Sequence, residues 1–162
     1  MIEIDLKEDA TARLTRLAEL LDDLTPVMDE IGEYMVEATK QRFVEGRGPD
    51  GVPWAPKRPA TIEAARRNPL RGNDPRPLHG LGSLKGSIAQ RAGPDHVEIG
   101  ANRIYAGVMQ FGADKGAFGA TATGSAIPWG DIPARPFLGG DDDDRDAIAA
   151  IASGWIARAA GS

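Results

Sequence analysis

The chain has 162 residues, of which 41% are hydrophobic, and its formal net charge is −5, so it is long enough to bury a core in one domain. It contains no cysteine, which excludes disulfides, thiolate metal sites and a cysteine nucleophile. No apolar run approaches the ~20 residues of a membrane helix, and the acidic N-terminus lacks the apolar segment of a secretory signal. We therefore expect a cytoplasmic protein without membrane contact.

The first 45 residues predict a strand followed by two amphipathic helices. Apolar and charged side chains alternate over residues 2–7, as in a short half-buried strand. Leucines then recur at helical spacing up to residue 24. Thr25 and Pro26 are typical of an N-cap and a first helical position, and they predict a second helix that runs to about Phe43.

Residues 45–82 contain most of the prolines and many of the glycines, and they predict a long loop or arm. One helical turn is expected around residues 61–67, with Thr61 as its cap. Within this arm, residues 57–76 carry six basic against two acidic side chains, which leaves this segment at +4 and the remainder at −9. Such a segment is a solvated loop, contacts an acidic protein surface, or binds nucleic-acid phosphates. Its basic residues are Lys57, Arg58, Arg66, Arg67, Arg71 and Arg76.

Regular structure is expected again after residue 83. Leu84 and Ile88 are apolar anchors, and residues 96–99 alternate as a strand after the turn at Gly93. Residues 103–112 have the spacing of a short helix. A second glycine-rich loop follows at 112–131, then an extended proline-rich segment, and an apolar stripe predicts a helix over 148–159. Together these elements predict an α+β fold in which a small, mostly antiparallel sheet packs with N- and C-terminal amphipathic helices, as one domain spanning 1–162.

No pattern in the sequence supports catalysis, a metal or a cofactor. The aspartates 141–144 and 146 lack the alternation of a calcium loop, and they are expected instead to cap the last helix. His79 and His96 have no patterned ligand beside them. Glu45 and Asp50 are candidate metal carboxylates, although Asp50 also suits the turn at 49–51.

Several side chains in loop-like sequence are candidate interface or structural groups. Trp54 lies among prolines and is expected to clasp the loop onto its own helices or to insert into a neighbouring subunit. Arg135 is held between two prolines, where it is expected to pair with a carboxylate of a partner or of its own chain. The full set is Trp54, Tyr105, Phe111, Trp129, Arg135 and Phe137.

Four segments, in this order, resemble the phage virion morphogenesis proteins. They are FVEGRGPDGVPWAP with the later Thr61, LHGLGSLKGSI, DHVEIGANRIYAGVMQFG, and IPARPFLG followed by acids and a helix. The resemblance covers roughly residues 1–160. The chain departs from the family pattern at Leu81, where Thr is frequent, and at Met109, where His is frequent.

The resemblance implies a non-enzymatic assembly protein that completes the tail or joins it to the head at the neck. It implies a homo-oligomer, with a hexameric ring favoured, that binds tail tube or head connector proteins. The nucleic-acid reading of the basic segment also has a form within this assembly, in which the segment faces DNA that passes through the ring lumen. Its location is then the bacterial cytoplasm during assembly and afterwards the virion. Two other classes stay open: a cell-wall hydrolase or nuclease that uses Glu45, Asp50 or the aspartate run, and a nucleic-acid-binding module that uses residues 57–76.

Overall fold

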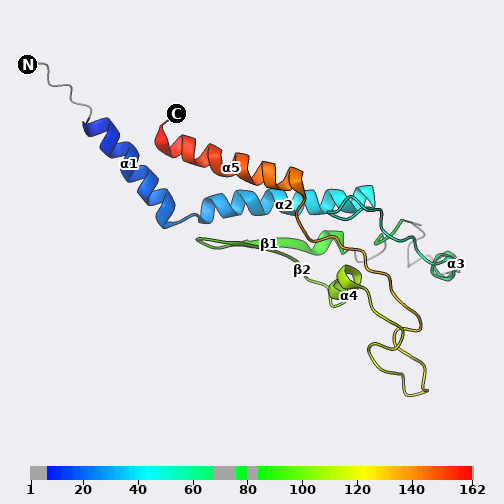
Figure 1. Cartoon of the computed structure of the whole chain (residues 1–162). Helices are drawn as coiled ribbons and strands as arrows, with labels where there is room; N and C mark the ends of the chain where they lie inside the picture. Colours follow the sequence, from blue (N-terminus) through cyan, green and yellow to red (C-terminus); the bar gives the residue numbers. More distant parts are fainter. Residues whose placement is uncertain (1–6, 68–75, 80–83, 162) are drawn as a thin grey trace, which may run out of the picture. The chain divides into compact units, whose positions relative to one another are not determined.

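The computed structural model describes residues 7–67, 76–79 and 84–161, and its fold is α+β, as predicted (Figure 1). Two helices precede the long arm, and a strand pair, a short helix and a long final helix follow it. The elements are α1 (Lys7–Asp22), α2 (Thr25–Glu45), α3 (Pro59–Arg67), the 3-10 helix η2 (Lys85–Ser87), β1 (Ile88–Ala92), β2 (Val97–Ala101), α4 (Ala106–Phe111) and α5 (Asp142–Ala160). Among the described residues, no helix combines the length and apolar character that a membrane span requires.

The chain divides into two compact units, and α2 and both strands contribute residues to each. One unit contains residues 1–35, 90–98 and 142–162, and the other contains 36–89 and 99–141. The expectation of a single domain stays a prediction. The strand expected over residues 2–7 falls almost wholly outside the described residues, and its last member, Lys7, begins α1.

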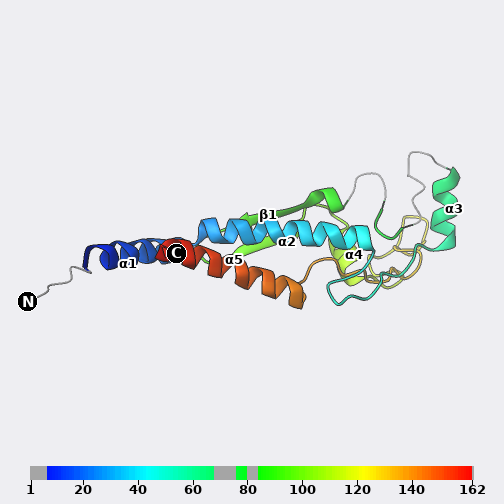
Figure 2. The same cartoon turned by 90° about the horizontal axis from the view of Figure 1, so that it is seen from above.

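In the first unit, α5 lies antiparallel beside the start of α2 (Figures 1 and 2). Two side-chain hydrogen bonds define this pairing: the Trp155 indole donates to Glu30 over 2.6 Å, and the Tyr34 hydroxyl donates to Asp144 over 3.3 Å. The buried face of α2 consists of residues four apart, as the helical period requires. These are Val27, Ile31 and Met35. Of the apolar stripe expected on α5, Trp155 takes part in this pairing and is half-buried, whereas Ile156 exposes 53% of its surface.

The start of α2 differs from the prediction by one residue. The carbonyl of Leu24 accepts the first helical bond from Met28, so Leu24, and not Thr25, is the N-cap residue. The side-chain bond at this end comes from Asp23, whose carboxylate accepts the Thr25 backbone N–H over 2.9 Å. The Thr25 side chain and its backbone N–H hold the pKa of Asp23 below its ordinary value.

In the second unit, aromatic and aliphatic side chains from distant segments form one core. Phe43 of α2 contacts Trp54 edge-on, with ring centroids 5.2 Å apart, and Phe137 at 5.4 Å. Leu84 and Ile88, the two predicted anchors, are also buried in this cluster. The predicted strand at 96–99 is confirmed as β2, which pairs with β1 in a hairpin closed by the Gly93 N–H to the His96 carbonyl.

The described residues of the long arm contain more helix than the sequence indicates. In place of one turn, α3 has nine residues and starts at Pro59, while the Arg58 carbonyl accepts the N–H groups of Thr61 and Ile62. Thr61 is therefore inside the helix and does not cap it. None of the residues of α3 is buried.

The second glycine-rich loop is closed by backbone pairing. Antiparallel bridges join Ala113 to Ile132 and Ala120 to Ala126. Between them, the Phe118 N–H donates to the Ile127 carbonyl over 2.8 Å. The 112–131 loop is therefore a hairpin-like excursion whose backbone is paired internally, although its side chains are mostly exposed.

Candidate binding pocket and assembly surface

The turn before Trp54 is built from backbone bonds and one aspartate. The Gly51 N–H donates to the Gly48 carbonyl over 3.0 Å, and Gly51 has φ of +72°, which suits glycine. The Asp50 carboxylate accepts the Val52 N–H over 3.0 Å. This is the predicted turn role of Asp50, and among the described residues no group of three or more potential metal ligands occurs.

Trp54 clasps its own chain. Its side chain is 6% exposed, and its indole N–H donates to the Pro136 carbonyl over 2.7 Å. Phe137, the next residue, is fully buried against Phe43. The loop at 46–56 and the extended segment at 133–138 are therefore tied together over the end of α2, which is one of the two outcomes expected for Trp54.

Arg135 is buried, and its partners are carbonyls. Its guanidinium donates to the Ala55 carbonyl over 2.8 Å and to the Pro56 carbonyl over 3.1 Å. Burial lowers the pKa of Arg135, because desolvation disfavours the charged form. Within residues 7–67, 76–79 and 84–161 no carboxylate pairs with it, so carbonyl contacts replace the intramolecular salt bridge that the sequence suggests.

Two further side chains hold the extended segment, and the sequence contains little sign of either. Buried Arg42 of α2 donates to the Gly139 carbonyl over 2.6 Å and lies 3.6 Å from the Asp141 carboxylate. Gln110 of α4 accepts the N–H of Phe137 at 2.9 Å, accepts that of Leu138 at 3.0 Å, and donates to the Leu138 carbonyl. The one sequence feature that points to Arg42 is its position next to Phe43, on the apolar face of a predicted helix.

Each of the two histidines contacts an oxygen of its own chain. His79 contacts the Phe43 carbonyl over 2.8 Å, and the Lys57 ammonium donates to the His79 carbonyl over 2.5 Å. His96 lies 2.6 Å from Asp95, and it holds the pKa of that exposed carboxyl below its ordinary value. The two histidines thus belong to different units of the chain.

The aspartate run lies at the N-terminal end of α5, as expected, but only Asp141 precedes the helix. Asp142, Asp143 and Asp144 form the first turn of α5, where carboxylates favour the positive end of the helix dipole. Asp144 is buried and accepts the Tyr34 hydroxyl, whereas Asp142 is exposed and pairs with Arg145.

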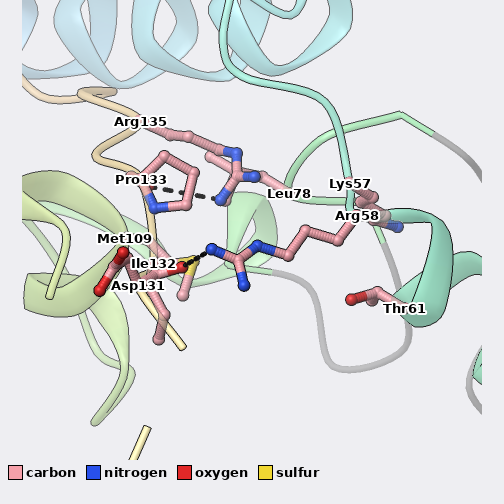
Figure 3. A pocket seen from close by; sticks show the side chains of 9 residues that line it. All are labelled: Lys57, Arg58, Thr61, Leu78, Met109, Asp131, Ile132, Pro133 and Arg135. Atoms are coloured by element: carbon pink, nitrogen blue, oxygen red, sulfur yellow. Dashed lines mark hydrogen bonds between the residues drawn. The ribbon is translucent and has the colours of Figure 1, made fainter. Parts of the chain in front are cut away.

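The basic residues of the arm divide into two groups in the structure. Arg66 and Arg67 lie on exposed α3, where both pair with Glu63. Lys57 and Arg58 precede α3 and line a pocket (Figure 3). Arg76 is exposed, and Arg71 lies outside the described residues.

The pocket has a volume of about 260 Å³ and combines an apolar surface with cationic groups. Arg58 donates to the Asp131 carbonyl over 2.6 Å, so the pocket spans the residues before α3 and the extended segment (Figure 3). The Asp131 carboxylate accepts the backbone N–H of Lys115. The pocket is lined by Lys57, Arg58, Thr61, Leu78, Met109, Asp131, Ile132, Pro133 and Arg135.

Large apolar side chains near the second loop are exposed. Phe111 and Trp129 each expose 81% of their surface, while Tyr105, Phe118 and Ile127 expose between 38% and 56%. Phe137, from the same set of candidates, is instead wholly in the core. Of the aromatic interface candidates, Trp54 and Phe137 are therefore core residues, and the others are on the surface. The sequence does not distinguish the two groups.

Comparison with known proteins identifies relatives of this chain. The model of the phage virion morphogenesis family matches residues 5–157. The chain is also similar to the Mu-like prophage FluMu G protein 2 of Haemophilus influenzae, with 29% identity over 137 residues that cover 85% of this chain and 81% of that protein. No solved structure matches the chain.

Proposed function

Because this chain belongs to the phage virion morphogenesis family, we propose that it is a non-enzymatic structural protein that completes the tail or joins it to the head at the neck. The similar protein of Haemophilus influenzae is described as that of a Mu-like prophage, which supports the assignment to a tailed phage or prophage. In this proposal the protein assembles in the host cytoplasm and then becomes part of the virion.

We propose further that the protein acts as a homo-oligomeric ring, with six copies favoured, stacked on the tail tube or on a head connector protein. The observation that carries this proposal is the exposure of Phe111 and Trp129, which are large apolar residues at and beside a loop whose backbone is paired internally. Exposed aromatic side chains of this kind are typical of protein interfaces. A ring also gives the basic arm a position from which to face DNA in the lumen.

Native mass spectrometry and negative-stain electron microscopy of the purified protein test this proposal, with and without the tail tube protein of the same phage. We expect closed oligomers of uniform size that bind the tube. A protein that stays monomeric at micromolar concentration and binds neither tube nor connector would overturn the proposal. Hydrolysis of peptidoglycan or DNA in the presence of divalent metals would instead support the enzyme alternative.

A further inference from the structure

The lining of the pocket in Figure 3 carries a net positive charge. Lys57, Arg58 and Arg135 all line it, and Asp131 is the single acidic residue among the described residues of its lining. The bonds of Arg58 and Arg135 end on backbone carbonyls, at 2.6 Å for Asp131 and 2.8 Å for Ala55. A hydrogen bond from a guanidinium to a neutral carbonyl is weaker than one to a carboxylate, because a carboxylate also carries a charge.

The remaining lining of the pocket is largely apolar. Leu78, Met109, Ile132 and Pro133 form this part of the surface. A cavity of about 260 Å³ with this lining accommodates one or two side chains and is unsuited to a hydrated DNA backbone. An anionic side chain on a protein partner fits it best, with its carboxylate on the guanidinium groups and its methylene on the apolar wall.

The chain itself carries a suitable group at the start of α5. Asp142, Asp143 and Asp146 are exposed there, within the densest run of acidic residues in the sequence. Glycines 139 and 140 precede the run and are also exposed, so the turn is presented to solvent. The exposed carboxylates of this first part of α5 are thus complementary to the pocket in charge.

We propose that this pocket binds carboxylates from the Asp142–Asp146 turn of a second copy of the chain. The inference rests on the proposed self-assembly and names the contact that mediates it. Pocket and acidic turn are different surfaces, so the contact is heterologous, and repetition of such a contact closes into a ring when the rotation permits. Arg135 is buried, so the proposed contact between its guanidinium and a carboxylate of the second copy would be strongly weakened by removal of either charged group.

Charge reversal on each side tests the contact. Arg58→Glu places a negative charge in the pocket, and the combined change Asp143→Arg with Asp146→Arg makes the turn positive. We expect each variant to raise the dissociation constant for self-association at least about tenfold, because truncating a close interfacial charge pair costs more than the ~1.4 kcal/mol of that factor. Sedimentation velocity over a concentration series measures it.

Mixing the two variants distinguishes a contact between copies from one within a copy. In an equimolar mixture, the pocket altered by Arg58→Glu receives the arginine turn, and the unchanged pocket of the other variant receives an unchanged aspartate turn. We expect mixed assemblies with nearly the affinity of the unaltered protein. If the mixture stays dissociated while both variants keep their cooperative thermal unfolding, the proposed pairing is wrong.

A second pocket variant avoids the loss of the Arg58 bond. Thr61→Glu adds a carboxylate at the rim of the pocket in the first turn of α3, where acids favour helix formation. It is expected to occupy the pocket and weaken association as Arg58→Glu does. Matched controls are Arg67→Glu on exposed α3 and Glu98→Arg on β2, neither of which lines the pocket or lies in the second loop, and both should assemble normally.

The outcomes separate this inference from the proposed function. If the unaltered protein forms rings and all pocket and turn variants do so equally well, the pocket assignment falls while the assembly function stands. A monomeric unaltered protein removes both. If Arg58→Glu and Thr61→Glu lose binding to a labelled double-stranded oligonucleotide but retain self-association, the pocket serves DNA and the assignment to a second copy is overturned.

Discussion

Trp54 makes two different contacts within the second unit, and each is expected to contribute separately to the free energy of unfolding. Its ring packs against Phe43, and its indole N–H donates to the carbonyl of Pro136. The ring contact is apolar burial, whereas the hydrogen bond joins segments that are 82 residues apart in the sequence. Substitution of this one residue therefore tests whether the arm is part of the folded core.

We expect Trp54→Ala to lower the free energy of unfolding by about 3–5 kcal/mol, the usual cost of removing a large buried aromatic. Trp54→Phe keeps most of the burial, leaves the Pro136 carbonyl without its donor, and should cost about 1–3 kcal/mol. Trp129→Ala is the control, because this exposed residue should change the stability of the monomer by less than about 0.5 kcal/mol. Urea denaturation measures all three, and equal effects for Trp54→Ala and Trp129→Ala would contradict the clasp.

At this scale the sequence predicts some roles and misses others for a clear reason. The turn role of Asp50 follows from a local pattern, since its bond partner is two residues away. Arg42 donates to carbonyls 95 and 97 residues away, and a backbone carbonyl is the same whichever residue bears it. The flanking prolines show in the sequence that the backbone of Arg135 is constrained. As for Arg42, the sequence does not indicate which carbonyls its guanidinium contacts.

At the scale of elements, periodicity predicts the helices better than the connections. The helical pattern indicates α2 with small errors at its ends, because the spacing of apolar residues follows the buried face. It also indicates α5, but this helix begins at Asp142, six residues before the apolar stripe. The backbone pairing inside 113–132 and the full length of α3 are not predicted. Both depend on main-chain bonds, to which the exposed side chains in these segments contribute little signal.

The end of α4 provides a test of one such connection. Gly112 has φ of +76°, and a Cβ placed there would lie 2.7 Å from the Ile132 carbonyl oxygen and 2.9 Å from the Ala134 nitrogen. We expect Gly112→Ala to destabilise the protein by roughly 2–4 kcal/mol, from left-handed strain and overpacking against backbone.

Gly107, five residues earlier in the same helix, is the matched control. A Cβ there would meet nothing within 4 Å, so Gly107→Ala should stabilise α4 by up to about 1 kcal/mol. Thermal unfolding of the two variants side by side gives the comparison. If both substitutions shift the midpoint in the same direction, the close approach of Gly112 to the extended segment is refuted.

For the whole molecule, the three tryptophans report on assembly because their exposures differ. Trp54 is buried, Trp155 is half-buried, and Trp129 is 81% exposed. If the surface around Trp129 lies between copies, assembly removes this one indole from solvent. The proposed ring thus makes a prediction that is independent of the charge-reversal experiment.

We expect acrylamide quenching of Trp129 to fall as the protein concentration rises through the association range. The contribution of Trp129 is obtained by subtracting the signal of Trp129→Phe from that of the unaltered protein at each concentration. Trp129→Ala should also weaken association by about 1–2 kcal/mol or more, as truncation of a large interface aromatic does. Quenching that stays constant while the mass of the particle increases would place the interface elsewhere.

The tie between the start and the end of the second unit also governs when this protein can fold during its synthesis. Phe43 and Trp54 emerge from the ribosome early, but the residues that cover them, Pro136 and Phe137, are translated last among the core. Long-range contacts of this kind slow folding, and they leave apolar surface uncovered in the incomplete chain. A nascent chain that lacks residues 133–138 therefore has no closed core in the second unit, so a subunit competent to assemble exists only after this segment has been synthesised.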